Sequence, residues 1–434
     1  MRKILPVTML AVTMAFVFVA SASAQTDTVQ YLPRVVDSIL EKLEKDADSL
    51  KDQRDSVTSA IRKKQKDLKE AQRKARKELR FDVSAIHAPD SPGVFQRVFH
   101  FSPVAQWNTG TCWCFSGTSF IEAEVARQTG RKIKLSEMHT VYYEYLAKAR
   151  YFVEQRGPEW NGEGSETNAL IRVMKQHGAM PESEYTGLLP GHLYHDHAAM
   201  AREIEAYLNY VKAHDYWDAD AVVEHVRLIL NAHLGTPPTE FKLEGKSYTP
   251  LTFAKDVMKI NLNDYVDVVS TLSFPYYTQG PYEVPDNWWY DSTYYNLPLD
   301  KWYSAIVSGI QRGYSIDLGG DVSEPGWYGQ TDLAVVPDFD IPMTYITPQS
   351  REFRFHNHSS TDDHGIHVVG YTAIDGRDWF LIKDSGSGGR RGKFWGYFFM
   401  RDDYLRLKML CFTVHKDVLR DVLDKFPKTT ASAE

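Results

Sequence analysis

The 434-residue sequence predicts an α+β fold, with a helical part that precedes a β-rich part along the chain. An apolar segment from Cys112 to Ala126 has the length and periodicity of a buried helix. Two apolar segments further on, 364–371 and 379–385, have the length of neighbouring strands. Hydrophobic residues make up 43% of the sequence and aromatic residues 13%, which excludes a chain that is disordered throughout.

Residues 1–24 are predicted to form a signal peptide. Arg2 and Lys3 precede an apolar run, and the small residues at 22–24 form a cleavage site after it. An uncleaved membrane anchor is the alternative, but the run is short for a span of about 20 residues. We therefore expect an exported protein, periplasmic or extracellular, with no stable membrane insertion after cleavage.

Residues 25–85 are predicted to form a charged helical arm. Between Val35 and Arg80 there is no Pro or Gly, and apolar residues follow one another at alternating steps of three and four. Arg54 and Lys64 interrupt this apolar seam, and the charge is mainly acidic in the first half and basic in the second. One long helix and an antiparallel helical pair both fit this pattern. Packing on the rest of the protein and assembly into a homo-oligomer stay open, whereas the acidic half and the net charge of -7 argue against nucleic acid binding.

The segment from Gln106 to Ser116 carries the strongest signal for chemistry. It reads QWNTGTCWCFS, so a Gly- and Thr-containing turn leads directly into the predicted helix at Cys112. The positive end of a helix dipole stabilises a thiolate, which makes Cys112 a candidate nucleophile. The backbone N–H of Cys112 and the amide of Gln106 are candidates for an oxyanion site.

A thiolate nucleophile needs a histidine and a residue that orients this histidine. His364 lies in the first predicted strand and Asp384 ends the second, so adjacent strands bring them together. His367 is the competing histidine. The two other cysteines, Cys114 and Cys411, form either a disulfide or free thiols, and we favour a core thiol for Cys114.

These motifs together resemble those of the papain-like cysteine peptidases. The resemblance rests on Gln106 six residues before a Cys-Trp pair, on Leu135-Ser136-Glu137, on His364 six residues before Gly370-Tyr371, and on Ile382-Lys383-Asp384-Ser385. It implies that Cys112 is the nucleophile, that His364 is the general acid and base, and that Gln106 is the oxyanion donor. It also assigns Glu163 and Gly164 to the substrate groove, at the place of a Gly-Gly pair in the family.

The number of residues between Cys112 and His364 narrows the resemblance to one branch of the family. His364 lies 252 residues after Cys112, whereas papain-like enzymes usually have about 130–150 residues between them. In this the chain is similar to the bleomycin hydrolase and aminopeptidase C branch. The resemblance implies a papain-like two-lobed fold over residues 86–434, with a helical lobe, a β-rich lobe and a helical insertion around 190–300. It further implies an aminopeptidase-like cysteine peptidase that acts on peptide substrates. Relatives in this branch narrow the cleft with their own C-terminal residues, which correspond here to Lys428 to Glu434.

Three positions depart from the family pattern. Asp384 replaces asparagine, Gly386 replaces tryptophan, and Glu163 replaces glycine. Without the tryptophan we expect a wetter site and an ionised Asp384, which raises the pKa of His364. A catalytically altered or inactive protein that acts as a peptide-binding or assembly scaffold stays as the alternative. The sequence has no phosphate-binding glycine motif and no fixed metal-binding motif, so we expect neither a cofactor nor a metal site.

Overall fold

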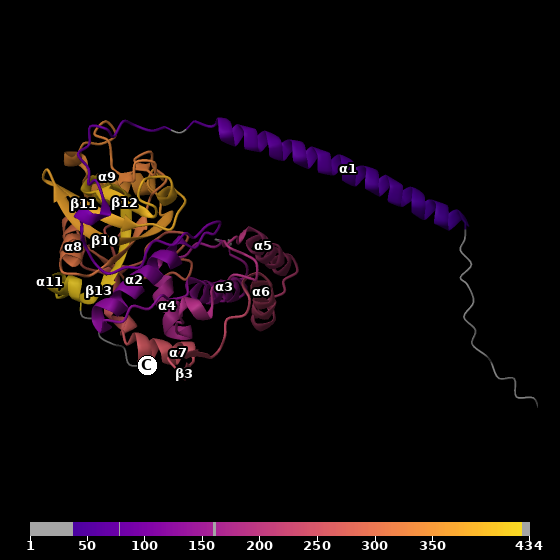
Figure 1. The fold of residues 1–434 in the computed structure, drawn as a ribbon, viewed down its shortest axis with the longest axis horizontal. Coiled ribbons are helices and arrows are strands. Elements are labelled where there is room, and N and C mark those ends of the chain that lie inside the picture. The colour runs from indigo at the N-terminus through magenta and orange to yellow at the C-terminus, as the bar shows by residue number, and fades with distance from the viewer. Residues whose placement is uncertain (1–37, 78, 159–161, 428–434) are drawn as a thin grey trace, which may run out of the picture. The chain divides into compact units, whose positions relative to one another are not determined.

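The computed structural model describes residues 38–77, 79–158 and 162–427 of the chain (Figure 1). The predicted signal peptide and the C-terminal residues Lys428 to Glu434 lie outside the described residues. The chain divides into two compact units, Met1–Lys77 and Glu78–Glu434, and each is described by itself.

The described part of the first unit is dominated by one helix, α1 (Ser38–Ala75). The structure thus has a single long helix where the sequence left a helical pair as the alternative. Two ion pairs at (i, i+4) spacing, Lys45 with Glu41 and Lys74 with Glu70, lie on its surface. Such exposed pairs stabilise a helix only slightly.

The helices of the second unit that precede its sheet share one hydrophobic core. They are α2 (Cys112–Thr129), α3 (Glu137–Glu154), α4 (Thr167–His177), α5 (Ala198–Ala213), α6 (Ala219–Leu234) and α7 (Pro250–Phe253). Local sequence sets their ends. Ser136 accepts a hydrogen bond from His139 N–H at the start of α3, and Gly130 ends α2 with a φ of 73°. Figure 1 shows these helices grouped beside the sheet.

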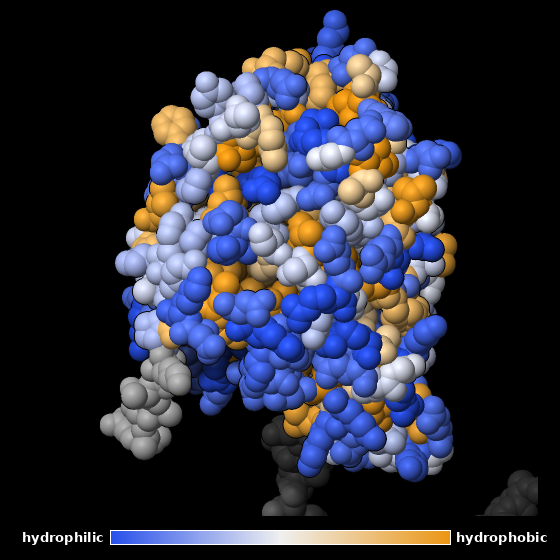
Figure 2. All heavy atoms as spheres, turned by 90° about the vertical axis from the view of Figure 1, so that its left-hand side faces the viewer, coloured by the Kyte–Doolittle hydropathy of each residue, from blue (hydrophilic) through white to orange (hydrophobic). Residues whose placement is uncertain are grey.

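The main sheet of the second unit has the order β5-β6-β4-β13-β7-β10-β11-β12-β9-β8, with β1 added on β10. The strands are β1 (Gln96–Arg97), β4 (Tyr265–Val269), β5 (Gln279–Gly280), β6 (Tyr294–Asn296), β7 (Ile316–Gly320), β8 (Trp327–Tyr328), β9 (Leu333–Ala334), β10 (His364–Ile374), β11 (Arg377–Lys383), β12 (Tyr397–Arg401) and β13 (Met409–His415). Strand β10 is antiparallel to both β7 and β11. A second hydrophobic core covers this sheet with α8 (Leu299–Gln311), α10 (Asp402–Lys408) and the segment around α11 (Arg420–Leu423). The face of the molecule in Figure 2 is mainly hydrophilic, with apolar side chains scattered across it.

The region predicted as a helical insertion, 190–300, has a mixed structure. Helices α5, α6 and α7 lie in it, together with a separate hairpin of β2 (Phe241–Leu243) and β3 (Lys246–Tyr248). Its last part contributes β4, β5 and β6 to the main sheet. Among the described residues, no helix is both long and apolar enough to cross a membrane.

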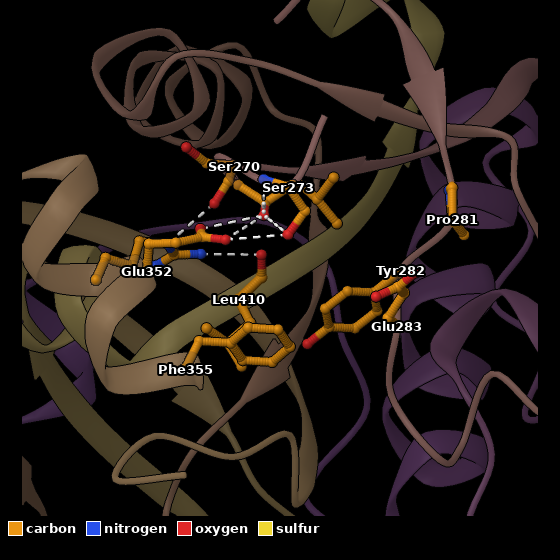
Figure 3. Close-up of a pocket in the computed structure, with 11 residues that line it drawn as sticks. Ser270, Ser273, Pro281, Tyr282, Glu283, Glu352, Phe355 and Leu410 are labelled. Atoms are coloured by element: carbon orange, nitrogen blue, oxygen red, sulfur yellow. Dashed lines mark hydrogen bonds between the residues drawn. The ribbon is translucent and has the colours of Figure 1, made fainter. Parts of the chain in front are cut away.

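The residues around a small cavity at the ends of β4 and β13 show how α9 (Pro348–His356) is held in place (Figure 3). Its volume of about 20 Å³ has room for about one water molecule. The buried Arg351 donates hydrogen bonds to three backbone carbonyl oxygens, those of Ser270, Arg406 and Leu410. Tyr282 lines the same cavity, and its ring stacks on Phe355 with centroids 6.1 Å apart. The packing around this cavity therefore holds Tyr282 beside the ends of β4 and β13.

Candidate active site

The fold brings the start of α2 against the start of β10. Cys112 is the first residue of α2, and His364 is the first residue of β10. A Cβ atom on Gly365 would lie 3.0 Å from Trp113 Cα and 2.9 Å from Ser116 Oγ. Only glycine allows the strand to approach the helix so closely, and this approach places His364 next to Cys112.

Asp384 reaches His364 from the neighbouring strand. It directly follows β11, whose residue Lys383 pairs with His367 of β10. His364 Nε2 lies 2.6 Å from Asp384 Oδ1. The structure therefore joins the two residues that the sequence placed at neighbouring strand ends.

The Asp384 carboxylate is enclosed by protein. Its side chain is 0% exposed. Besides the imidazole, it accepts hydrogen bonds from the backbone N–H groups of Gly386 at 2.9 Å and Gly389 at 3.2 Å. The expectation of a wetter site was wrong, because the loop that follows Asp384 folds back and covers the carboxylate with its own backbone.

The electrostatics favour a charged pair. Burial acts to raise the pKa of Asp384, but His364 and the N–H groups of Gly386 and Gly389 outweigh it and hold this pKa below its usual value. Burial likewise acts to lower the pKa of His364, but Asp384 and then Cys112 raise it well above its usual value. The ionised form of Asp384 is thus favoured first by the charge of His364 and then by hydrogen bonds, rather than by solvent.

Gln106 lies beside this pair. Its Nε2 donates to the carbonyl oxygen of Thr109 at 2.7 Å, and its Oε1 accepts from Ser385 Oγ at 2.8 Å. Its backbone N–H also donates to the Ser385 carbonyl oxygen at 3.0 Å. A primary amide carries two N–H groups, and the bond to Thr109 uses one of them.

Glu163 lies beside the start of α2, and Gly164 follows it in the chain. The Glu163 carboxylate accepts a hydrogen bond from the Gly110 N–H, and its carbonyl oxygen accepts one from Trp113 Nε1 at 3.1 Å. Burial raises the pKa of Glu163. A Cβ atom on Gly164 would lie 2.4 Å from Asp286 Oδ2, so a larger residue here would displace Asp286.

Sequence reasoning missed a group formed by two acidic residues and a cysteine. One ligand atom from each of Glu166, Asp362 and Cys411 lies within 4.8 Å of the others, and Asp362 accepts a hydrogen bond from Tyr282 Oη at 2.7 Å. Burial raises the pKa of Asp362 to about 7 and the pKa of Glu166 well above its usual value. The one available signal was the position of Asp362, two residues before His364. The described residues contain no other group of three such ligands, and this group contains no histidine.

The remaining histidine and cysteine candidates belong to the core. His367 is 0% exposed, and its Nδ1 lies 2.9 Å from Ser119 Oγ. All three cysteines are free, so Cys114 and Cys411 form no disulfide with each other. Cys114 is fully buried, and its thiol donates to the Glu137 carbonyl oxygen, which confirms the prediction of a core thiol.

Comparisons with known proteins show the family of the chain. The Peptidase C1-like family matches residues 172–432, more than half of the chain, and this range contains both His364 and Asp384. The chain is 25% identical over 361 residues to aminopeptidase C of Streptococcus thermophilus, covering 72% of this chain and 79% of that protein. It is 22% identical over 346 residues to aminopeptidase C of Lactobacillus delbrueckii subsp. lactis, covering 69% of this chain and 76% of that protein.

A solved structure shares the fold. PepW from Lactobacillus rhamnosis HN001 (DR20) aligns with a TM-score of 0.59 at 20% sequence identity, over 77% of this chain and 85% of that chain. The predicted α+β fold and the papain-like resemblance are therefore confirmed. The chain belongs to the Peptidase C1-like family and is a papain-like, cysteine-type peptidase.

Proposed function

We propose that the protein cleaves single residues from the free amino terminus of peptides, through an acyl-enzyme formed on Cys112. The observation that carries this proposal is the 2.6 Å contact between His364 Nε2 and Asp384 Oδ1, placed at the start of α2. With Nε2 bound to the carboxylate, Nδ1 is the ring nitrogen for proton exchange with the reacting groups.

The steps follow from this arrangement. The Cys112 thiolate forms a bond from Sγ to the peptide carbonyl carbon, and the oxyanion receives hydrogen bonds from the Cys112 backbone N–H and Gln106 Nε2. The carbon–nitrogen bond then breaks as the His364 imidazolium gives its proton to the leaving amine. In the second half, His364 takes a proton from water, the water oxygen attacks the thioester, and the Cys112 thiolate leaves. Asp384 holds the ring orientation throughout.

The preference for a free amino terminus has two supports. The curated relatives in the comparison are named aminopeptidase C. Asp362, which lies two residues before His364 in the sequence, forms an acidic group with Glu166. A substrate ammonium group brings the positive charge that such carboxyl groups favour.

Fluorogenic peptides with a free or an acetylated amino terminus test this preference. We expect kcat/KM to be at least about 10-fold higher for the free peptide, because a charged hydrogen bond contributes about 1.5–3 kcal/mol. We expect Asp362→Asn to reduce this ratio, and Glu283→Gln, an exposed carboxylate nearby, to leave it unchanged. Equal rates for the two peptides would contradict the proposal and indicate an endopeptidase.

Peptide binding without turnover is the second candidate. It is favoured by Glu163, which stands at the place of a glycine in the family and whose carboxylate accepts a hydrogen bond from the Gly110 N–H. Both proposed functions are those of an exported protein, since we propose that residues 1–24 are a signal peptide.

A further inference from the structure

We propose that α1 pairs with α1 of a second copy of this chain in an antiparallel, two-stranded coiled coil. The structure supplies the first step of the argument, because Ser38–Ala75 is a single continuous helix. Its acidic half and its basic half therefore cannot fold back on each other within one chain. By helix geometry it is about 57 Å long, and an isolated helix in water is only marginally stable without packing on one face.

An apolar seam runs along this helix and is exposed. Its members and their exposed fractions are Leu43 59%, Leu50 54%, Val57 59%, Ile61 53% and Leu68 58%. With Ala47, Arg54, Lys64, Ala71 and Ala75 they form an unbroken series of alternating three- and four-residue steps. This repeat of 3.5 residues is the pattern of a left-handed coiled coil.

The seam is too narrow to pack on a globular surface. Most positions that flank it are polar, among them Glu44, Asp46, Lys51 and Gln65, and Ala60 is an apolar exception. A helix that covers a globular core carries a wider apolar stripe, with a third apolar position in each heptad. A partner helix of the same kind therefore fits this surface best.

Arg54 and Lys64, the two cations in the seam, decide whether the two helices run parallel or antiparallel. In a parallel, in-register pair, Arg54 meets Arg54 of the second copy and Lys64 meets Lys64, which places like charges in the apolar seam. An antiparallel pair with Leu50 opposite Ile61 of the second copy avoids both contacts. In that register Arg54 lies opposite Val57, and by the same spacing Lys64 lies opposite Ala47.

The charges along the helix surface also favour the antiparallel arrangement. Residues 38–56 carry six acidic and four basic side chains, whereas residues 57–75 carry two acidic and seven basic ones. An antiparallel pair places the acidic half of each helix along the basic half of the other. A parallel pair would place the two strongly basic halves side by side.

Sedimentation of the full-length protein tests the pairing. We expect a dimer whose Kd rises at least about 100-fold in Leu50→Glu, because each copy loses a buried leucine from the seam. Ser59→Glu adds the same charge on the opposite face of the helix and should leave the dimer intact. A monomeric wild type, or a dimer that survives Leu50→Glu, would overturn the proposal.

Cross-linking tests the direction, independently of peptidase activity. In the antiparallel register Leu43 lies opposite Leu68 of the second copy, so a mixture of Leu43→Cys and Leu68→Cys proteins should give disulfide-linked dimers on oxidation. Both changes are made in a Cys112→Ala background, and the other cysteines, Cys114 and Cys411, are buried. Efficient linking of Leu43→Cys to itself would instead indicate a parallel pair and contradict the proposal.

Discussion

Replacing Cys112 by alanine lowers kcat for peptide hydrolysis by at least about 10⁴-fold, because the variant has no atom that can form the acyl-enzyme. The fold is expected to persist, since Cys112 lies at the first position of α2, and its thiol is not part of the buried core. Initial rates with a free-terminus peptide and a thermal melt of the same preparation check both statements.

Cys114→Ala is the matched control. Cys114 lies two residues further along the same helix, and burial raises the pKa of its thiol well above the usual value. We expect this variant to keep its activity wherever it remains folded. Turnover by Cys112→Ala above about 1% of the wild-type rate would assign the nucleophile to another residue.

Replacing Asp384 by asparagine moves the alkaline limit of activity to lower pH. Activity requires the Cys112 thiolate together with the His364 imidazolium, and the Asp384 carboxylate raises the pKa of that imidazolium. A neutral amide removes this attraction, so His364 loses its proton at a lower pH than in the wild type. The kcat/KM profiles of both proteins, measured across the alkaline limb, show the displacement.

Two further variants make this result specific. Asp384→Ala removes the hydrogen bond as well as the charge, and we expect kcat to fall at least about 100-fold because the ring loses its orientation. Asp363→Asn removes a carboxylate next to His364 in sequence, but that carboxylate bonds to the Val322 N–H instead. Its alkaline limb should move less than that of Asp384→Asn. An unmoved limb in Asp384→Asn would mean that the carboxylate carries no charge in the active form.

The parts of the site that sequence could predict are local ones. The start of α2 at Cys112 follows from a turn next to an apolar run, and the meeting of His364 with Asp384 follows from two adjacent strands. Each of these features depends on short stretches of sequence and on a rule about one element or about two neighbouring strands. The resemblance to a family then assigned the roles of nucleophile, general acid and base, and oxyanion donor to Cys112, His364 and Gln106.

The parts that sequence could not predict depend on distant segments. The burial of Asp384 depends on how the loop through Gly389 closes over it, and no periodicity in the sequence encodes this closure. The contact of Glu166 with Cys411 joins residues 245 positions apart. Strands β4 and β6 lie in a region that was expected to be helical, because short strands gain most of their stability from their neighbours in the sheet.

Covalent labelling with a thiol-reactive peptide epoxide tests the central claim most directly, because only a thiolate poised beside a histidine reacts selectively. The masses of the proteolytic fragments then identify which of the three free cysteines carries the label. We predict a single label on Cys112, with slower labelling in Asp384→Ala. Burial raises the pKa values of Cys114 and Cys411 well above the usual range, so both should remain unmodified. A folded protein that takes up no label, or takes it up on Cys114 or Cys411, would contradict the assignment of Cys112 as the nucleophile.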